Sequence, residues 1–253
     1  MKTPIFGEKV LYSGPHIPTS PNLINMAKVT KKSASNALGS GANLATFQIS
    51  ELAQYTKEKA YDTNASTMFH LFYVGRDDVH DILKYVLSRV TVSLYLNMYG
   101  YDDQELNDIL FAKAMDPSIT MLITLDKSQT GSKTEKQLLD SDMAKNPTAY
   151  NTHFVIGNSA TNQISHTKGF VADGKIAGEG STNWSTSGEG VFVISGQAGG
   201  AGYKAQNNTQ SIIMDPDTIS RFTAELIAEH LAAKSQVIQP KPASRPKAPK
   251  TKS

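Results

Sequence analysis

The chain has 253 residues, of which 39% are hydrophobic and 19% are charged, and it contains no cysteine. This composition excludes a small disulfide-stabilised domain and a cysteine-ligated metal centre, and it suffices for one sizeable α/β core. No apolar run is long enough for a transmembrane helix, and residues 1–10 lack the hydrophobic stretch of a signal peptide. We therefore expect a cytoplasmic protein, although export by a specialised secretion system stays open.

The charged residues are unevenly distributed along the chain. It carries 25 basic and 23 acidic residues, but six of the basic ones fall within residues 234–253, where there is no acidic residue. This stretch is also rich in proline, so we expect a disordered basic tail. Such a tail could attract nucleic acid or an anionic membrane, or it could simply keep the protein soluble.

Residues 1–45 are rich in Ser, Asn, Gly, Pro and Lys and have no apolar periodicity, which predicts an N-terminal arm or a loop-rich segment. One folded domain is therefore expected over residues 46–233. Its first clear element is an amphipathic helix that begins near Asp77, with apolar side chains at helical spacing, and the strand-like residues 90–96 follow it.

The same pattern then repeats. Residues 102–114 predict a second helix, and residues 119–125 predict a strand that ends at Asp126. A helix between two strands is typical of a βαβ unit, so the sequence predicts an α/β fold.

The segment from Ser165 to Ala172 alternates as a strand does, so that His166 and Lys168 share one face. An imidazole beside an ammonium group suits the binding of an anion. The cation binds the negative charge and disfavours a second positive charge on the ring, which stays available as a nucleophile or base. Phosphate is the natural candidate for that anion.

Asp173 lies at an odd offset from His166, so an unbroken strand would place it on the opposite face. Asp173-Gly174 is also a favoured hairpin turn, with residues 175–177 as the returning strand. We expect Asp173 to orient the catalytic residues and not to be the nucleophile, and a purely structural role in the turn stays open.

Gly180, Ser181, Thr182 and Asn183 stand at the end of that returning strand. Their backbone, hydroxyl and carboxamide groups can donate hydrogen bonds to phosphate oxygens. Further along, residues 211–214 predict a strand, and Asp215-Pro216 predicts the start of a helix.

Taken singly, these polar residues are what an exposed strand and a turn contain. Six specified residues at these offsets (His166, Lys168, Asp173, Gly180, Ser181 and Asn183), however, occur by chance in about one of 10⁵ sequences. The pattern resembles the HKD motif of the phospholipase D superfamily, and the resemblance extends over about residues 68–233. It implies an α-β-α sandwich and makes residues 46–233 a catalytic domain.

The resemblance also implies a mechanism with two motifs in each active site. One histidine forms a covalent phosphohistidine, and the other protonates the leaving oxygen. This chain has one motif, because His153, His70 and His80 lack a lysine two residues on. A twofold homodimer would therefore complete the site, with one His166 as the nucleophile and its symmetry mate as the general acid.

In such a dimer Lys168 and Asn183 bind the substrate and stabilise the charge on phosphorus. The resemblance implies no metal and no cofactor for the reaction. Ser181 is a further substrate-binding candidate, and Gly180 and Glu189 are candidates for support from behind the site. One departure from the motif's usual surroundings is Asn208-Thr209-Gln210, where many relatives have Asn-x-Glu.

The substrate stays open between three classes. A small dimeric endonuclease is favoured because the chain is short. Its nucleic-acid groove would be lined by aromatic side chains, unless these belong to the core; the candidates are Tyr95, Tyr99, Tyr101 and Trp184. One alternative is a phospholipase D or phosphatidyltransferase, either inside the cell or as a secreted effector, in which residues 196–203 form either a lid or an ordinary connection. The other is an inactive binding protein.

Overall fold

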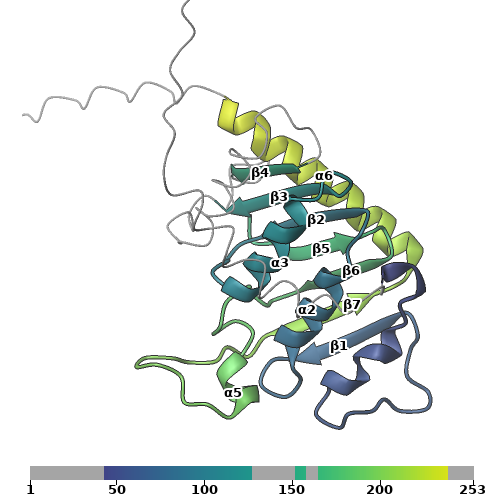
Figure 1. Cartoon of the computed structure of the whole chain (residues 1–253), viewed down its shortest axis with the longest axis vertical. Helices are drawn as coiled ribbons and strands as arrows, with labels where there is room; N and C mark the ends of the chain where they lie inside the picture. Colours follow the sequence, from purple (N-terminus) through teal and green to yellow (C-terminus); the bar gives the residue numbers. More distant parts are fainter. Residues whose placement is uncertain (1–42, 127–151, 158–164, 239–253) are drawn as a thin grey trace, which may run out of the picture.

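The computed structural model describes residues 43–126, 152–157 and 165–238, with backbone alone for 152–157 and 236–238. Its centre is a seven-stranded sheet in the order β1-β7-β6-β5-β2-β3-β4 (Figure 1). The strands are β1 Phe69–Tyr73, β2 Ser93–Met98, β3 Thr120–Asp126, β4 Thr152–Gly157, β5 Lys168–Ala172, β6 Ile176–Gly180 and β7 Thr209–Ile213.

The helices cover both faces of this sheet. They are the 3₁₀-helices η1 Leu44–Thr46 and η2 Ile49–Tyr55 and the α-helices α2 Val79–Ser88, α3 Gln104–Ala114, α5 Val191–Ser195 and α6 Pro216–Ile238. The long helix α6 runs across strands β2 to β6 behind the sheet, and α2 and α3 lie against each other in front of it (Figure 1). The predicted α/β class is confirmed, and the described layers are helix, sheet and helix.

Two apolar clusters hold these layers together. The larger fills the space between α2, α3 and the sheet, with fully buried members such as Ile82, Leu96 and Phe170. The smaller joins α6 to the other face through Val171, Ala177, Ile219 and Leu226. Since strand residues two apart share a face, Lys168 points with Phe170 toward the α2 and α3 layer.

The topology combines a parallel and an antiparallel half. Strands β2, β3 and β4 are parallel, and α3 connects β2 to β3 as the predicted βαβ unit. Strands β5, β6, β7 and β1 are antiparallel to their neighbours, and β5 joins the two halves by pairing antiparallel with β2. The strand that begins with Lys168 is therefore the central strand of the sheet.

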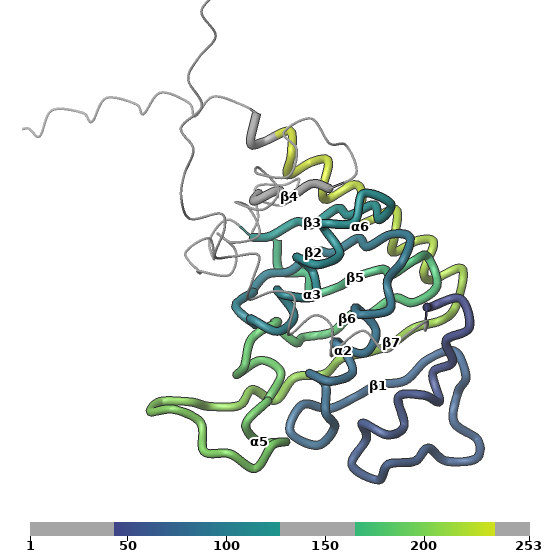
Figure 2. Tube along the Cα trace, in the orientation of Figure 1, coloured from purple at the N-terminus to yellow at the C-terminus, as the bar shows by residue number. Residues whose placement is uncertain are grey.

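The domain begins before the predicted boundary at residue 46 and ends after the predicted one at 233. Leu44, Ile49 and Leu52 are buried in the larger cluster, and η2 contacts α2. Figure 2 shows this N-terminal segment, in purple, beside β1. At the other end α6 continues to Ile238. The rest of the predicted arm and tail, residues 1–42 and 239–253, lies outside the described residues. None of the described helices is long and apolar enough to cross a membrane.

The turn between β5 and β6 is the predicted Asp173-Gly174 pair. Both residues have positive φ, 51° for Asp173 and 61° for Gly174, as a tight hairpin turn requires. The Asp173 carboxylate accepts hydrogen bonds from the backbone N–H groups of Thr91, Val92 and Ser93 and from the Thr91 hydroxyl, at 2.8–3.2 Å. These bonds explain why β2 begins at Ser93 and not at residue 90.

Replacing Asp173 with alanine is expected to lower the free energy of unfolding by about 2 kcal/mol, because several backbone donors lose a charged acceptor and the left-handed turn becomes strained. Urea unfolding measures this change. A matched control is Asp108→Ala, which removes an exposed aspartate on α3 with a single hydrogen bond, to Gln104. Equal effects of the two substitutions would contradict the anchoring role of Asp173.

Candidate active site

His166 and Lys168 lie side by side where the chain enters the central strand. Strand β5 begins at Lys168, so His166 precedes it and its side chain is exposed. The Lys168 ammonium donates a hydrogen bond to the His166 carbonyl oxygen at 2.7 Å and lies 3.2 Å from Nδ1 of the ring. The structure thus brings the two residues into direct contact.

Lys168 itself is buried, with an exposed fraction of 4%. Burial lowers the pKa of Lys168 below that of a free lysine, and the negative charge of Glu179 offsets part of this effect. A desolvated ammonium group beside an exposed imidazole leaves the ring accessible to a substrate while the cation stays fixed behind it.

The segment Met98-Tyr99-Gly100, at the end of β2, connects the parts of the motif. Met98 pairs with Lys168 across the sheet. The Tyr99 ring lies 4.6 Å from the His166 ring and 5.0 Å from Lys168 Nζ, measured to ring centroids. A Cβ on Gly100 would come within 2.9 Å of the Asn183 carboxamide, so Gly100 must be small for Asn183 to occupy its place. One short segment therefore contacts all three residues.

Asn183 is half-buried, and its Oδ1 atom has no hydrogen-bond partner among the described residues. The backbone that follows Asn183 is fixed by hydrogen bonds of both the N–H group and the carbonyl oxygen of Trp184. Trp184 N–H donates to Gly100 O at 2.9 Å, and Trp184 O accepts from Asp102 and Asp103 N–H at 2.9 and 3.1 Å. The carboxamide is thus fixed next to the Tyr99 segment with unused hydrogen-bonding capacity.

Gly180 and Ser181 shape the approach to Asn183 through close contacts with β7. A Cβ on Gly180 would lie 2.1 Å from Thr209 O, a separation that only glycine avoids. The Ser181 hydroxyl is exposed, donates to Asn208 Oδ1 at 3.2 Å and accepts from Thr209 N–H at 3.0 Å. In this state Ser181 links β6 to β7 through its side chain.

Three residues that sequence reasoning missed hold the chain in front of His166. Ser165 N–H donates to Asp126 Oδ2 at 2.7 Å, and the Ser165 hydroxyl donates to Asn97 Oδ1 at 2.9 Å. All three are buried, and Asp126 and Asn97 come from the ends of β3 and β2. These bonds explain why the predicted strand from Ser165 begins only at Lys168. The sequence carried a signal for Asp126, which ends a predicted strand, whereas Asn97 lies just after the predicted strand 90–96.

Gln210 is the last residue of Asn208-Thr209-Gln210, the departure from the motif's usual surroundings. It is buried on β7 opposite Gly180, and its Nε2 donates to Ser211 O at 3.1 Å. Its Oε1 has no partner among the described residues. The side chain here is therefore a neutral amide with an unused acceptor.

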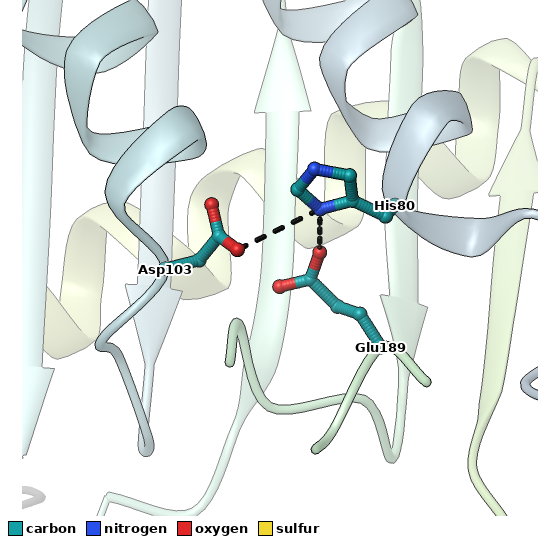
Figure 3. Close-up of side chains that lie close together, drawn as sticks. All are labelled: His80, Asp103 and Glu189. Carbon is teal, nitrogen blue, oxygen red and sulfur yellow. Dashed lines mark hydrogen bonds and ion pairs between the residues drawn. The ribbon is translucent and has the colours of Figure 1, made fainter. Parts of the chain in front are cut away.

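The remaining predicted residues lie away from His166 in different ways. Lys168 begins β5, whereas Asp173 follows the last residue of this strand. Its carboxylate binds the residues before β2. Glu189 is fully buried and contacts His80, with 2.5 Å between Oε2 and Nδ1 (Figure 3). Burial raises the pKa of the Glu189 carboxyl. It disfavours charge on His80 as well, but the negative charges of Glu189 and Asp103 outweigh this and raise the pKa of His80.

Of the four aromatic candidates, Tyr99 alone contacts the motif histidine. Trp184 and Tyr101 are buried in the larger apolar cluster, and Tyr95 packs against the smaller cluster beneath α6. Of the two roles considered for the aromatic candidates, membership of the core therefore applies to these three residues.

No family model and no curated protein matches the chain. Among solved structures it is similar to Nuc, a phospholipase D family member from Salmonella typhimurium (13% identity, covering 64% of this chain and 92% of Nuc, TM-score 0.48). It is also similar to NucT from Helicobacter pylori (17% identity, 65% of this chain and 96% of NucT, TM-score 0.44). A third is the phosphatidylserine synthase of Haemophilus influenzae Rd KW20 (14% identity, 77% of this chain and 39% of that one, TM-score 0.44). At these identities the chemistry has to be derived from the side chains of this chain.

Proposed function

We propose that the protein is a metal-independent phosphodiesterase in which His166 forms a covalent phosphohistidine. The observation that carries this proposal is the contact of an exposed imidazole with a buried ammonium group, His166 with Lys168 at 3.2 Å, inside a motif of six fixed residues. The cation supplies the charge that a transferring phosphoryl group needs, and the accessible ring supplies the nucleophile.

The reaction has two displacement steps. In the first, a His166 ring nitrogen forms a bond to phosphorus, the bond from phosphorus to the leaving oxygen breaks, and a second imidazole gives that oxygen a proton. In the second, water loses a proton to the second imidazole and attacks phosphorus, and the bond to His166 breaks. Both histidines then have their original protons.

The Lys168 contact fits a neutral ring before substrate is bound. When Nδ1 accepts from the ammonium group, Nε2 carries the only proton of the imidazole. A nucleophilic Nε2 requires the other tautomer, and a general acid requires the imidazolium, which has a proton on each nitrogen. In both roles the ammonium group therefore donates to a phosphate oxygen in place of Nδ1.

The second imidazole comes from a second copy of the chain. The sequence has one histidine with a lysine two residues on and Gly-Ser-x-Asn downstream. In a twofold dimer the same surface of both subunits meets, which would place both His166 rings, with Lys168 and Asn183 of each chain, at one phosphate. The unpartnered Oδ1 of Asn183 is consistent with this shared site.

Nucleic acid is the substrate class that the described surface favours. A lipid-cleaving enzyme needs an apolar rim for acyl chains. None of the exposed large apolar side chains of the described residues belongs to the motif or to Met98-Tyr99-Gly100, and of these side chains Tyr73 pairs with Thr209 at the motif's edge of the sheet; they are Met68, Phe69, Tyr73, Val92, Met115, Val193 and Leu231. The half-buried Tyr99 ring beside His166 instead offers a surface on which a base can stack.

Phosphodiester cleavage in excess chelator tests the proposal. Purified wild type is offered single-stranded DNA, duplex DNA, RNA and mixed phospholipid vesicles, each beside His166→Ala. We expect nucleic-acid cleavage by wild type that chelator does not reduce. Headgroup release from vesicles alone would move the assignment to a phospholipase D, and activity that requires added metal would contradict the mechanism.

A further inference from the structure

Outside the motif, three buried side chains from three separate segments meet next to the loop that follows Asn183. They are His80 on α2, Asp103 at the N-cap of α3, and Glu189, with exposed fractions of 7%, 3% and 0% (Figure 3). One ligand atom from each residue lies within 4.8 Å of those of the other two. An imidazole and two carboxylates are thus collected at one point away from solvent.

The oxygens of this cluster have more capacity than their surroundings use. Glu189 Oε1 is buried without a hydrogen-bond partner in the described part of the chain, and Figure 3 shows it turned toward the Asp103 side of the cluster. Asp103 Oδ1 accepts from Leu106 N–H at 2.7 Å, whereas Asp103 Oδ2 lies 3.6 Å from His80 Nδ1, beyond hydrogen-bond length. A fully buried carboxylate with an unpartnered oxygen, beside a second buried carboxylate, attracts a cation, because uncompensated buried charge is costly.

We propose that His80, Asp103 and Glu189 form a binding site for one divalent transition-metal ion, of which Zn²⁺ fits best. The 3.6 Å between His80 Nδ1 and Asp103 Oδ2 is near the separation of about 3.3 Å between two ligands of a tetrahedral zinc with bonds of about 2.0–2.1 Å. The ion takes the place of any proton on Nδ1, which leaves to solvent, and Glu189 turns so that an oxygen faces the ion.

The chemistry of the donors separates Zn²⁺ from the harder cations. Mg²⁺ and Ca²⁺ prefer all-oxygen sites, whereas an imidazole with two carboxylates suits zinc. The other ring nitrogen of His80 is oriented as zinc-bound histidines commonly are. Nε2 lies 3.5 Å from the Glu105 carboxylate, which Lys84 holds at 2.7 Å, so a carboxylate faces the N–H on the far side of the ring.

The expected consequence of binding is stabilisation, separate from the phosphodiester chemistry. An ion held by these residues connects α2, the start of α3 and the loop that carries Asn183, because Asp103 N–H also bonds to Trp184 O. The proposal depends on none of the reacting residues, so it can fail while the phosphodiesterase assignment stands, and the reverse also holds. At temperatures where both forms are folded, zinc removal is expected to leave turnover unchanged.

Thermal unfolding of the full-length protein tests the site. Wild type is first freed of metal with chelator and dialysed, and it is then melted alone, with Zn²⁺ and with Mg²⁺. At a zinc concentration about 100-fold above Kd, the midpoint should rise by about 5–10 °C, with no comparable rise for Mg²⁺. Equilibrium dialysis should find one zinc ion per chain. No shift with zinc, or an equal shift with magnesium, would overturn the proposal.

Two conservative variants identify the ligands. Glu189→Gln keeps the size of the side chain, and Asp103→Asn keeps an oxygen that can cap α3, so each is expected to fold. Each should lose at least about tenfold in zinc affinity, as removal of a charged ligand predicts. His70→Ala, on the edge strand β1, is the control for incidental binding and should retain wild-type affinity. Unchanged zinc affinity in both ligand variants would overturn the assignment.

Discussion

Replacing His166 with alanine is expected to lower phosphodiester turnover by at least about 10³-fold while the protein keeps its fold. The ring is exposed and its described contacts are Lys168 and Tyr99, so its loss should change the free energy of unfolding by no more than about 0.5 kcal/mol. Single-turnover assays and urea unfolding measure the two quantities. Residual activity above about one part in 10³ would contradict the nucleophile assignment.

The same variant tests whether two chains share one site. If both imidazoles are needed, an equimolar mixture of wild type and His166→Ala that has exchanged subunits retains about one quarter of the wild-type activity, because only wild-type pairs react. Retention of about one half would indicate that each chain acts alone. His70→Ala serves as the matched control, since it removes a histidine from β1 without touching the motif, and its mixtures should stay fully active.

Replacing Lys168 with methionine is expected to lower turnover by about 10²–10³-fold, the usual cost of losing one donor to the developing charge. Methionine keeps most of the volume of the buried side chain and removes the ammonium group that contacts His166. Lys175→Met is the control, because Lys175 is exposed on the same hairpin and its loss should be neutral. Equal effects of both changes would show that general surface charge, and not the buried contact, matters.

The pH profile gives a second test of Lys168. The charged ammonium is the working form, and burial lowers the pKa of Lys168, so the contribution of Lys168 to activity is complete below this lowered value and is lost as pH rises through it. The alkaline limb of kcat/KM, to which the proton of the second imidazole also contributes, should therefore contain a step below the pKa of a free lysine, about 10.4. It should move to higher pH in Lys168→Arg, measured on the activity that this variant keeps. An alkaline limb at the same pH in both proteins would argue against Lys168 as its source.

Local patterns predicted the elements that carry the motif. Asp173-Gly174 is a turn whose chemistry is complete within two residues, so the β5–β6 hairpin could be predicted without knowing its neighbours. Alternation likewise predicted that His166 and Lys168 would be together, and Asp215-Pro216 predicted the start of α6. The α/β class followed from the helices and strands between residues 77 and 126.

Features that depend on distant neighbours could not be predicted in this way. Ser165 meets Asn97, 68 residues away, and His80 meets Glu189 across 109 residues, and neither pair has a local signal. Trp184 is predicted to line a nucleic-acid groove because it adjoins the motif in sequence, and Tyr101 because it lies near the end of a predicted strand. The structure buries both, because Tyr101 and Trp184 form a backbone bridge that turns their rings into the core.

The central position of β5 affects how the protein would lose activity on heating. Strands at the edges of a sheet open more readily than those in its middle, and β1 and β4 are the two edges here. Lys168 pairs with Met98 on β2, and the neighbouring Gly169 pairs with Glu179 on β6, so the strand that begins with Lys168, two residues after His166, is paired on both sides. Fraying at either border would leave it in place, and inactivation should then coincide with cooperative melting of the whole domain.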